Sequence, residues 1–375
     1  MPRFLSAYRD YVLIALFVLL TSAIVWLPFV PQLSAVGVHI KNTDTGVLYR
    51  NYDGLLYVVA AKTFYNPTAI NALHLENGLP ASYFAAHLPL YPAIIRALSF
   101  LGYPKAMIAV TILSTVLMGW MFYYILRQKN LTKRPLLLTM TMLMLPRFLV
   151  VRSVGSPESL FMLLALTAIF FYEKKNYIGA GLAGGLAVMT KLPGILLFPG
   201  FALAEIVRTR ESKKFTSASV WLLLIPIGLF AVCTIYAQQY YDPFAYWHTG
   251  YVVPMPYPFS AFDASAKWVG THWLEEIVLY FYLYAVTVIN SYRHQLRSLF
   301  YFSLVFFIGL IFVQHRDISR YALPLWPITC IIFEKFFTSR RAVIAMIILL
   351  PAIYLYAWSF IQGNAMPVGN WAPYL

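Results

Sequence analysis

The sequence predicts an all-α polytopic membrane protein, and three observations support this fold class. Hydrophobic residues make up 61% of the chain, whereas charged residues make up only 11%. Residues 11–30 carry no charge, and a membrane-spanning helix needs about 20 such residues. Further apolar runs follow, and together they predict about eleven transmembrane helices. These runs lie at 103–126, 136–151, 157–173, 177–190, 193–207, 217–240, 274–292, 298–314, 321–338 and 341–361.

The basic residues predict how the chain is oriented in the membrane. Lys and Arg gather before the first run and in short connections at 127–134, 174–175, 208–214, 293–297 and 335–341. The positive-inside rule places such connections, and the N-terminus, in the cytoplasm. The net charge of +14 therefore reflects topology, and no soluble domain offers a surface for nucleic acid. Short loops favour a prokaryotic plasma membrane, with the endoplasmic reticulum as the alternative.

One connection decides the number of helices. Residues 177–207 are long enough for a single helix, but that helix would move the basic connection at 208–214 to the outer side. We therefore expect a break at 190–194, where Pro193 and Gly194 disfavour a helix interior. Lys191 then lies at the outer surface.

The predicted outer connections are unequal in length, and residues 1–375 form a single predicted integral-membrane domain. The first extracytoplasmic loop covers 31–102 and the second covers 241–273. The first is too long for a simple connection. It contains two predicted helices, one at 54–65 and one starting after Pro92, both expected to lie in the membrane interface.

Asp53 is the candidate catalytic residue of the first loop. A carboxylate directly before a helix can cap it, and a carboxylate at a membrane surface can also accept a proton from an incoming hydroxyl. Both roles are compatible with one residue. Asp44 stands in an Asp-Thr-Gly segment, which resembles the aspartic protease signature, but only one copy is present. A turn is the expected role of Asp44, with assistance to Asp53 as the alternative.

Two further positions are candidates for binding an anion. Arg316 and Arg320 lie close together between two predicted spans, and arginine matches phosphate oxygens bidentately. The alternative is an interfacial anchor tied by an Arg316–Asp317 ion pair.

Glu158 begins a predicted helix, where an acid either complements the helix dipole or orders nearby basic groups. The histidines lack metal-ligand spacing, so neither a metal nor a cofactor is expected.

Six short motifs, taken in order, carry a resemblance to a known family. They are NYDGLLY at 51–57, HLPLYP at 87–92, SPESLF at 156–161, GGLAVMTKLPG at 184–194, YDPFAY at 241–246 and RYALPLWP at 320–327. In this order they resemble the GPI-anchor mannosyltransferase II family (phosphatidylinositol-glycan class V), which belongs to the GT-C integral-membrane glycosyltransferases. The chain departs from that pattern at Tyr52, at His87-Leu88, at Ser156-Pro157 and at Lys191.

The resemblance implies a GT-C-like enzyme that moves a sugar, mannose by analogy, from a polyprenyl-phosphate donor to a lipid-linked or cell-surface glycan. The reaction is expected to invert the anomeric centre on the non-cytoplasmic face, among membrane lipids. Asp53 is then the base, and Lys191, Arg316 and Arg320 contact the phosphate. The other expected substrate-binding residues are Tyr52, Tyr57, His87, Glu158, Asp242, His315 and Tyr321.

A transporter or flippase for a polyprenyl-linked lipid is the competing prediction. Its phosphate site would use the same arginines without any covalent chemistry. Such a protein normally shows matching halves and polar residues in the middle of its spans. Neither feature is evident in this sequence.

Overall fold

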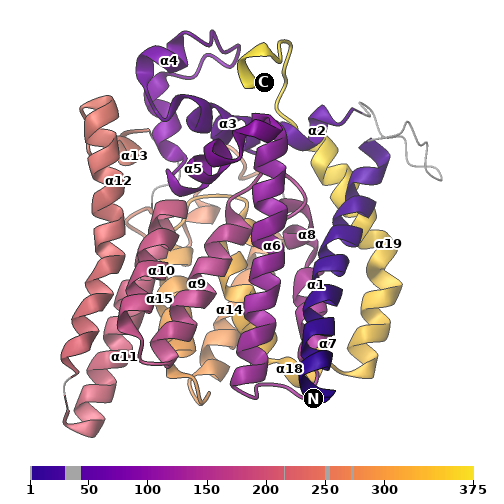
Figure 1. Ribbon diagram of the computed structural model, residues 1–375, viewed down its shortest axis with the longest axis vertical. Helices are drawn as coiled ribbons and strands as arrows, with labels where there is room; N and C mark the ends of the chain where they lie inside the picture. The colour runs from indigo at the N-terminus through magenta and orange to yellow at the C-terminus, as the bar shows by residue number, and fades with distance from the viewer. Residues whose placement is uncertain (1, 30–43, 215, 250–253, 272–273) are drawn as a thin grey trace. The chain divides into compact units, whose positions relative to one another are not determined.

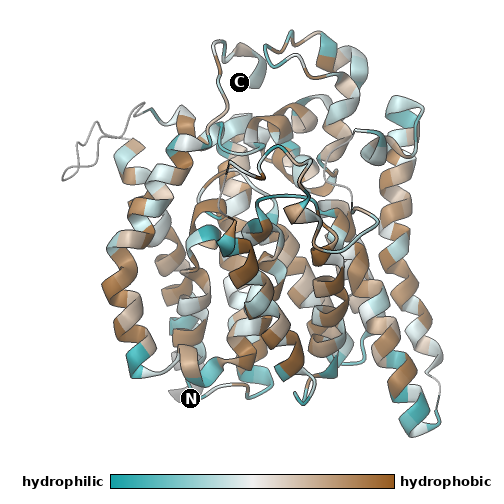
Figure 2. Ribbon diagram, turned by 180° about the vertical axis from the view of Figure 1, so that it is seen from behind, coloured by the Kyte–Doolittle hydropathy of each residue, from teal (hydrophilic) through white to brown (hydrophobic). Residues whose placement is uncertain are grey.

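The computed structural model of the protein describes residues 2–29, 44–214, 216–249, 254–271 and 274–375. These ranges fold into α-helices and short 3-10 helices and contain no β-strand (Figure 1). Hydrophobic residues cover long stretches of the helices (Figure 2). Among the described residues, 5 helical segments are long and apolar enough to cross a membrane: Tyr8–Phe29, Tyr103–Gln128, Leu192–Ser212, Ser217–Tyr240 and Arg340–Gly363. Shorter apolar helices accompany them, so the protein is an all-α polytopic membrane protein, as predicted.

Prolines interrupt two of the predicted runs. The run 136–151 forms two helices, α7 (Pro135–Leu143) and α8 (Pro146–Val151), because a proline lacks the N–H that would continue the first helix. The break expected at 190–194 is present, since α10 (Tyr177–Thr190) ends there and a short 3-10 turn leads into α11 (Leu197–Ser212). Helix α16 (Ile318–Tyr321) ends where the run 321–338 begins, and that run is divided into α17 (Trp326–Ile332) and α18 (Glu334–Phe337).

The chain forms two compact units. The first consists of Met1–Leu163 and Glu334–Leu375, and the second of Leu164–Phe333. The first unit contains α1 (Pro2–Trp26), α6 (Tyr103–Gln128), α7, α8, α18 and α19 (Arg340–Gly363). Helix α9 (Glu158–Glu173) begins in the first unit and continues into the second.

At one end of the first unit, three of the predicted cytoplasmic segments come together. The Tyr123 hydroxyl donates to the Asp10 carboxylate at 2.6 Å and accepts from Arg127 at 3.3 Å. The Arg134 guanidinium donates to the Thr338 carbonyl at 2.9 Å. The N-terminal segment, 127–134 and 335–341 therefore share one end of this unit.

The other end of the first unit carries the first loop, of which 31–43 lie outside the described residues. Its helices are α2 (Gly46–Tyr49), α3 (Gly54–Thr63), α4 (Pro67–Asn71) and α5 (Leu90–Ala97). Helix α3 is buried throughout its first eight positions, so protein surrounds it where an interfacial helix was expected. Helix α5 starts at Leu90 and not after Pro92, because a helix tolerates proline in its first turn. Tyr91, Pro92 and Ile95 form its buried face.

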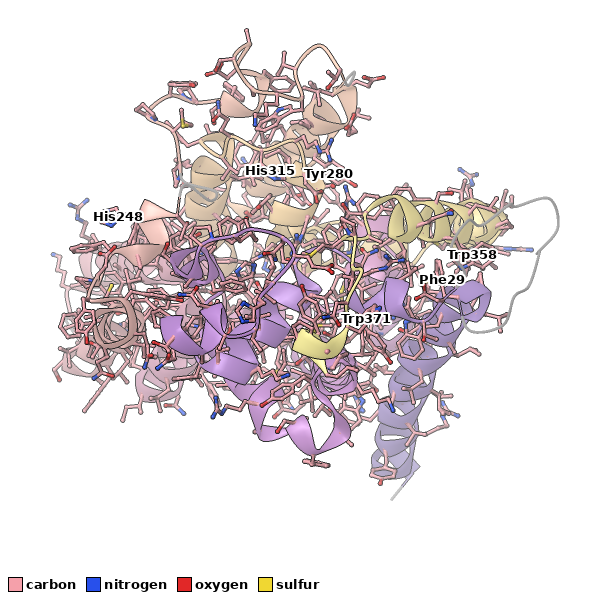
Figure 3. The ribbon with its side chains drawn as sticks, turned by 90° about the horizontal axis from the view of Figure 1, so that it is seen from above. Phe29, His248, Tyr280, His315, Trp358 and Trp371 are labelled. Atoms are coloured by element: carbon pink, nitrogen blue, oxygen red, sulfur yellow. The ribbon has the colours of Figure 1, made fainter. Side chains whose placement is uncertain are left out.

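The C-terminal segment after α19 packs on this first loop. The Met366 amide donates to the Arg50 carbonyl at 2.7 Å, and the Glu76 carboxylate accepts from the Gly369 amide at 2.8 Å. The Trp371 ring, labelled in Figure 3, stands edge-on to Tyr49. Since the tail and the first loop are on one side, an even number of membrane crossings must separate them. The predicted runs between 103 and 361 satisfy that condition.

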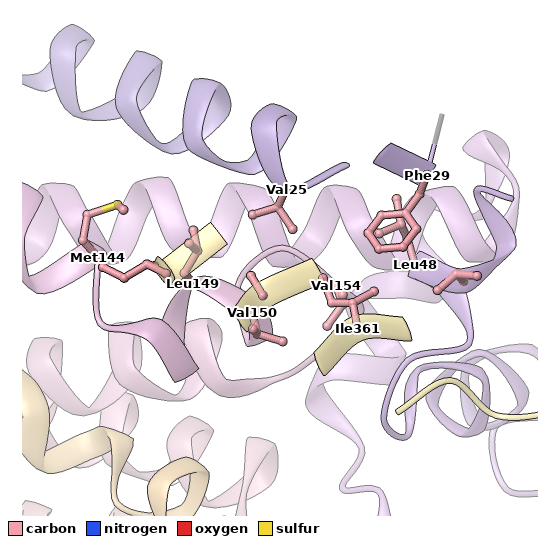
Figure 4. Packing of buried hydrophobic residues seen from close by; sticks show 11 residues of the cluster. Val25, Phe29, Leu48, Met144, Leu149, Val150, Val154 and Ile361 are labelled. Carbon is pink, nitrogen blue, oxygen red and sulfur yellow. The ribbon is translucent and has the colours of Figure 1, made fainter. Parts of the chain in front are cut away.

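An apolar cluster in the first unit fixes the helices next to the loop. Val25 and Phe29 at the end of the first span pack with Val150, Val154 and other buried residues (Figure 4). Leu48 of α2 and Ile361 of α19 belong to the same cluster. Within a bilayer such side chains stabilise the structure by close packing, since lipid tails are as apolar as they are. The cluster therefore ties the start of the first loop to the end of α19.

The second unit packs α10, α11, α12 (Leu224–Tyr240), α14 (Glu275–Ser291) and α15 (Arg297–Ile311). Arg297 forms an ion pair with Glu211, and the Ser298 amide donates to Glu173 at 3.3 Å. The predicted cytoplasmic connections at 174–175, 208–214 and 293–297 thus lie at one end of this unit. In the second loop, 250–253 and 272–273 lie outside the described residues.

Candidate active site

Asp53 occupies the residue before α3, but it does not cap that helix with its side chain. Its backbone carbonyl accepts hydrogen bonds from the amides of Leu56, at 2.9 Å, and Tyr57, at 3.1 Å. Its carboxylate makes no capping hydrogen bond, so the capping role expected of this side chain is wrong. Burial raises the pKa of the Tyr83 phenol, and the negative charge of Asp53 raises it further.

Aromatic side chains extend the site from Asp53 to His87. Tyr57 lies one turn after Asp53 along α3, and its ring meets the His87 ring edge-on with centroids 4.7 Å apart. Tyr83 approaches the same imidazole at 6.2 Å. The His87 side chain is buried, and its backbone carbonyl accepts a hydrogen bond from the Tyr65 hydroxyl. The structure thus brings together Tyr57 and His87, two of the expected substrate-binding residues, and adds Tyr83.

Glu158 belongs to the same group of side chains through Tyr91. The Tyr91 ring stands edge-on to Tyr57 at 5.0 Å. Burial raises the pKa of Tyr91, and the negative charge of Glu158 raises it further. Glu158 is 2% exposed, at the first position of α9, which is where a carboxylate also complements the helix dipole.

Thr111 of α6 links α5 to the segment that precedes Glu158. Its side-chain oxygen lies 2.6 Å from the Tyr91 hydroxyl and donates to the Ser156 carbonyl at 3.1 Å. The Ser156 amide donates back to the same oxygen at 3.2 Å. Helix α5 and the segment that precedes Glu158 are therefore fixed to one point on α6.

Tyr52 lies beside Asp53 in contact with two other helices. Its hydroxyl accepts a hydrogen bond from Arg147 of α8 at 3.0 Å, and its ring lies 5.5 Å from the ring of Phe360 in α19. The Arg147 guanidinium covers the same Phe360 ring at 4.1 Å. The backbone of Tyr52 adopts φ +49°, in the left-handed region.

In the second unit, the ring of Tyr321 is in contact with two other side chains, those of Lys191 and His315. The Lys191 ammonium lies 5.5 Å from the centre of the Tyr321 ring, and His315 meets that ring at 5.0 Å. Trp268 of the second loop also contacts the His315 ring, with the ring centroids 5.8 Å apart. The Asp317 amide donates to Nδ1 of His315 at 2.9 Å, so the proton of the neutral imidazole is on Nε2. His315 is labelled in Figure 3.

The two arginines of this segment differ in exposure. Arg320 is 8% exposed within α16, whereas Arg316 is exposed. The Asp317 carboxylate accepts a hydrogen bond from the Ser319 hydroxyl at 3.0 Å. The Arg320 guanidinium is therefore held within the protein, where a charge is favourable only when it is paired.

Asp242 and Asp44 have local contacts. Asp242 accepts a hydrogen bond from the Phe244 amide at 2.9 Å, just before α13 (Ala245–His248), and its other oxygen lies 2.7 Å from Nδ1 of His248. That bond to His248 lowers the pKa of the Asp242 carboxyl. Asp44 accepts from the Val47 amide at 3.2 Å and pairs with Arg50, which confirms its expected role in a turn.

Three residues of these groups escape sequence reasoning: Tyr83, Arg147 and Trp268. Only Arg147 leaves a signal in the sequence, because it is a lone charge inside the apolar run 136–151. Among the residues that the structure describes, no group of three or more His, Cys, Asp or Glu side chains could hold a metal ion. The chemistry available here is proton transfer at a carboxylate and the binding of an anion by basic side chains.

Comparison with known proteins adds one family. A model described as glycosyltransferase family 87 matches residues 88–314, which is more than half of the chain. No curated protein matches the chain. The matched residues include Glu158, Lys191 and Asp242. They begin just after His87 and end just before His315, so Asp53 and the two arginines of the 315–321 segment lie outside them.

Proposed function

The chain belongs to glycosyltransferase family 87, and from that premise we propose that it uses a polyprenyl-phosphate sugar as donor. The proposed acceptor is a lipid-linked or cell-surface glycan on the non-cytoplasmic face of a prokaryotic plasma membrane. The proposed sugar is mannose, which rests on the motifs that resemble the GPI-anchor mannosyltransferase II family. A donor with a lipid tail suits an all-α membrane protein, because the bilayer delivers it.

In the proposed reaction Asp53 acts as the general base. Its carboxylate takes the proton of an acceptor hydroxyl while that oxygen attacks the anomeric carbon of the sugar. The bond between the anomeric carbon and the phosphate oxygen breaks, and polyprenyl phosphate leaves with the bonding electrons. Attack on the face opposite the leaving group inverts the anomeric centre.

Basic side chains of the second unit are proposed to stabilise the departing phosphate. Arg320, Arg316 and Lys191 would share the negative charge that develops as the anomeric bond breaks. The Lys191 ammonium lies over the ring of Tyr321, and that ring is also in contact with the His315 imidazole. A preorganised cation is worth more than a mobile one, since it needs no reorganisation during the reaction.

The other predicted residues are given supporting roles around the base. Tyr57 and His87 form the wall next to Asp53, and Glu158 reaches the same group through Tyr91. Asp242 is proposed to keep the second loop in shape through its contacts with Phe244 and His248. The observation that carries the proposal is the match to glycosyltransferase family 87 over residues 88–314.

A direct assay tests this function. Purified protein in lipid vesicles is given radiolabelled polyprenyl-phosphate mannose, glucose or arabinose together with lipid acceptors. We expect labelled product and free polyprenyl phosphate in equal amounts, and neither product from Asp53→Asn. NMR of the product then reports the anomeric configuration. Movement of intact donor across the bilayer, without cleavage, would support a flippase and contradict the proposal.

A further inference from the structure

The backbone next to Asp53 is held in an unfavourable conformation. Tyr52 has φ +49°, and a bulky side chain rarely adopts the left-handed region. Such a conformation persists only where the surrounding structure fixes it, and it is common near functional sites. Because Tyr52 directly precedes Asp53, the dihedral angles of Tyr52 decide where the Asp53 carboxylate points.

Contacts from the end of α19 fix the main chain on the N-terminal side of Asp53. The side-chain amide of Asn51 donates to the Ile361 carbonyl at 2.5 Å, and the backbone of Asn51 forms an isolated antiparallel β-bridge with Ala365. The Tyr52 amide donates to the Asn364 carbonyl at 3.4 Å. These bonds fix the main chain at residues 51 and 52, and none of them involves the Tyr52 side chain.

The Tyr52 side chain is held by Arg147 and Phe360. Nη1 of Arg147 donates to the Tyr52 hydroxyl at 3.0 Å, and the guanidinium lies on the Phe360 ring at 4.1 Å. The Tyr52 ring lies 5.5 Å from the same Phe360 ring at 36°. Each of the three side chains therefore contacts the other two, and they come from the first loop, α8 and α19.

The position of Arg147 is energetically unfavourable for a cation, which indicates that this residue has a functional role. It is the second residue of α8, where the positive end of the helix dipole disfavours a cation. It is also the lone charge in the apolar run 136–151, and a charge inside such a run is rare and commonly functional. A structural link between α8 and α19 could be made from apolar side chains at a lower cost.

We propose that Arg147 is a positioning residue for the catalytic carboxylate. It holds the hydroxyl and ring of Tyr52, keeps the left-handed backbone in place, and so aims Asp53 at the acceptor hydroxyl. This inference rests on the proposed role of Asp53 as base. It assigns Arg147 an effect on the rate of the chemical step and none on the binding of the donor.

The test combines two single variants with their double variant. In the sugar-transfer assay, Arg147→Gln and Tyr52→Phe should each lower kcat by about 10- to 100-fold, because a small displacement of a catalytic group has effects of that size. The KM for the donor should stay unchanged. The double variant should be no slower than Arg147→Gln alone, since both changes break the same link. Tyr49→Phe, in the same loop with its ring on Trp371, is the matched control and should keep the parental kcat.

Thermal unfolding separates positioning from simple stabilisation. Tyr52→Phe keeps the ring on Phe360, so it should fold normally and still lose turnover. A parental kcat for Tyr52→Phe, or additive losses in the double variant, would overturn the inference while leaving Asp53 as base. Asp53→Asn is measured in parallel, and a parental rate for that variant would overturn both the proposed function and this inference.

Discussion

At the residue scale, the main chain and the side chain of Asp53 serve different purposes. The carbonyl starts α3 by accepting two amide hydrogen bonds, whereas the carboxylate makes no capping bond. Truncation of an aspartate that caps a helix typically costs about 1 kcal/mol. Asp53 is not of that kind, so variants at this position can separate chemistry from stability.

We expect Asp53→Asn to lower turnover by about 100-fold or more, because the amide keeps the volume of the side chain but accepts no proton. Asp53→Ala should lose turnover equally, without the loss of about 1 kcal/mol that follows when a side-chain cap is removed. Sugar transfer and thermal unfolding in detergent measure the two effects. Asp44→Asn is the matched control, and a loss there with a parental rate for Asp53→Asn would make Asp44 the base.

Arg320 is the residue on which the phosphate site depends most. We expect Arg320→Ala to raise the KM for the donor by roughly 10- to 100-fold, the equivalent of one charge-assisted hydrogen bond. Arg320→Lys should raise it less, because lysine keeps the charge but loses the planar fork. Arg297→Ala, which removes an exposed ion pair with Glu211 in the same unit, should leave the KM unchanged.

Normal donor kinetics in both Arg320 variants, with normal thermal unfolding, would contradict the anion site. The segment 315–321 would then be an interfacial anchor. Loss of thermal stability in Arg320→Ala is expected to some degree, because Arg320 is buried. The lysine variant preserves more of the packing, so its KM for the donor is the more informative measurement.

Sequence reasoning at this scale finds residues in motifs and misses residues defined by distant contacts. Asp53, His87 and Glu158 stand in short motifs with a local chemical meaning. Arg147 and Tyr52 lie 95 positions apart, so no local pattern connects them. The error about the Asp53 cap has a similar cause, because a capping position follows from sequence whereas the rotamer of its side chain follows from packing.

At the element scale, the glycines of the 184–194 motif have a packing role. A Cβ on Gly185 would lie 2.6 Å from the Leu224 carbonyl oxygen, and one on Gly228 would lie 2.3 Å from the Gly185 carbonyl oxygen. Helices α10 and α12 therefore approach through their backbones, as membrane helices with small residues commonly do. In this motif the glycines build the helix pair, and Lys191 follows the end of α10, with its ammonium 5.5 Å from the centre of the Tyr321 ring.

We expect Gly185→Val to lower the free energy of unfolding by about 1–3 kcal/mol, because the added side chain forces α10 and α12 apart. Thermal unfolding in detergent measures this loss. Gly363→Ala is the matched control, since a Cβ at Gly363 would have no neighbour within 4 Å. Equal stability of both variants would show that the two helices do not pack through these glycines.

The sequence predicts helices better than it predicts their ends and surroundings. Apolar length is enough to find α1, α6 and α19, because each is a continuous run. Pro146 marks the break between α7 and α8, although the run reads as one span by composition. The burial of α3 is not visible in the sequence, since an apolar helix looks the same whether protein or lipid surrounds it.

At the scale of the whole molecule, the contacts of the C-terminal segment constrain the topology. Residues 366–373 bond to the first loop through Arg50, Glu76 and Lys62. Both segments must therefore be on the same side of the membrane. The basic connections of the first unit lie at its other end, which is the arrangement that the positive-inside rule predicts for a chain with a cytoplasmic N-terminus.

Single cysteine probes test this topology. The probes replace Gln128 at the exposed end of α6, Ala72 after α4 and Pro367 in the C-terminal segment, and Cys233 is first replaced by alanine because it is partly exposed. In sealed, oriented vesicles, a membrane-impermeant maleimide should label Ala72→Cys and Pro367→Cys from the outside and Gln128→Cys only after the vesicles are opened. The first two belong to segments that bond to each other, whereas the third lies among the basic residues at the opposite end of the first unit.

Labelling of Ala72→Cys and Pro367→Cys from opposite sides would contradict the packing of the tail on the first loop. Labelling of Gln128→Cys from the outside, with the other two protected, would reverse the orientation and place Asp53 in the cytoplasm, away from the proposed donor.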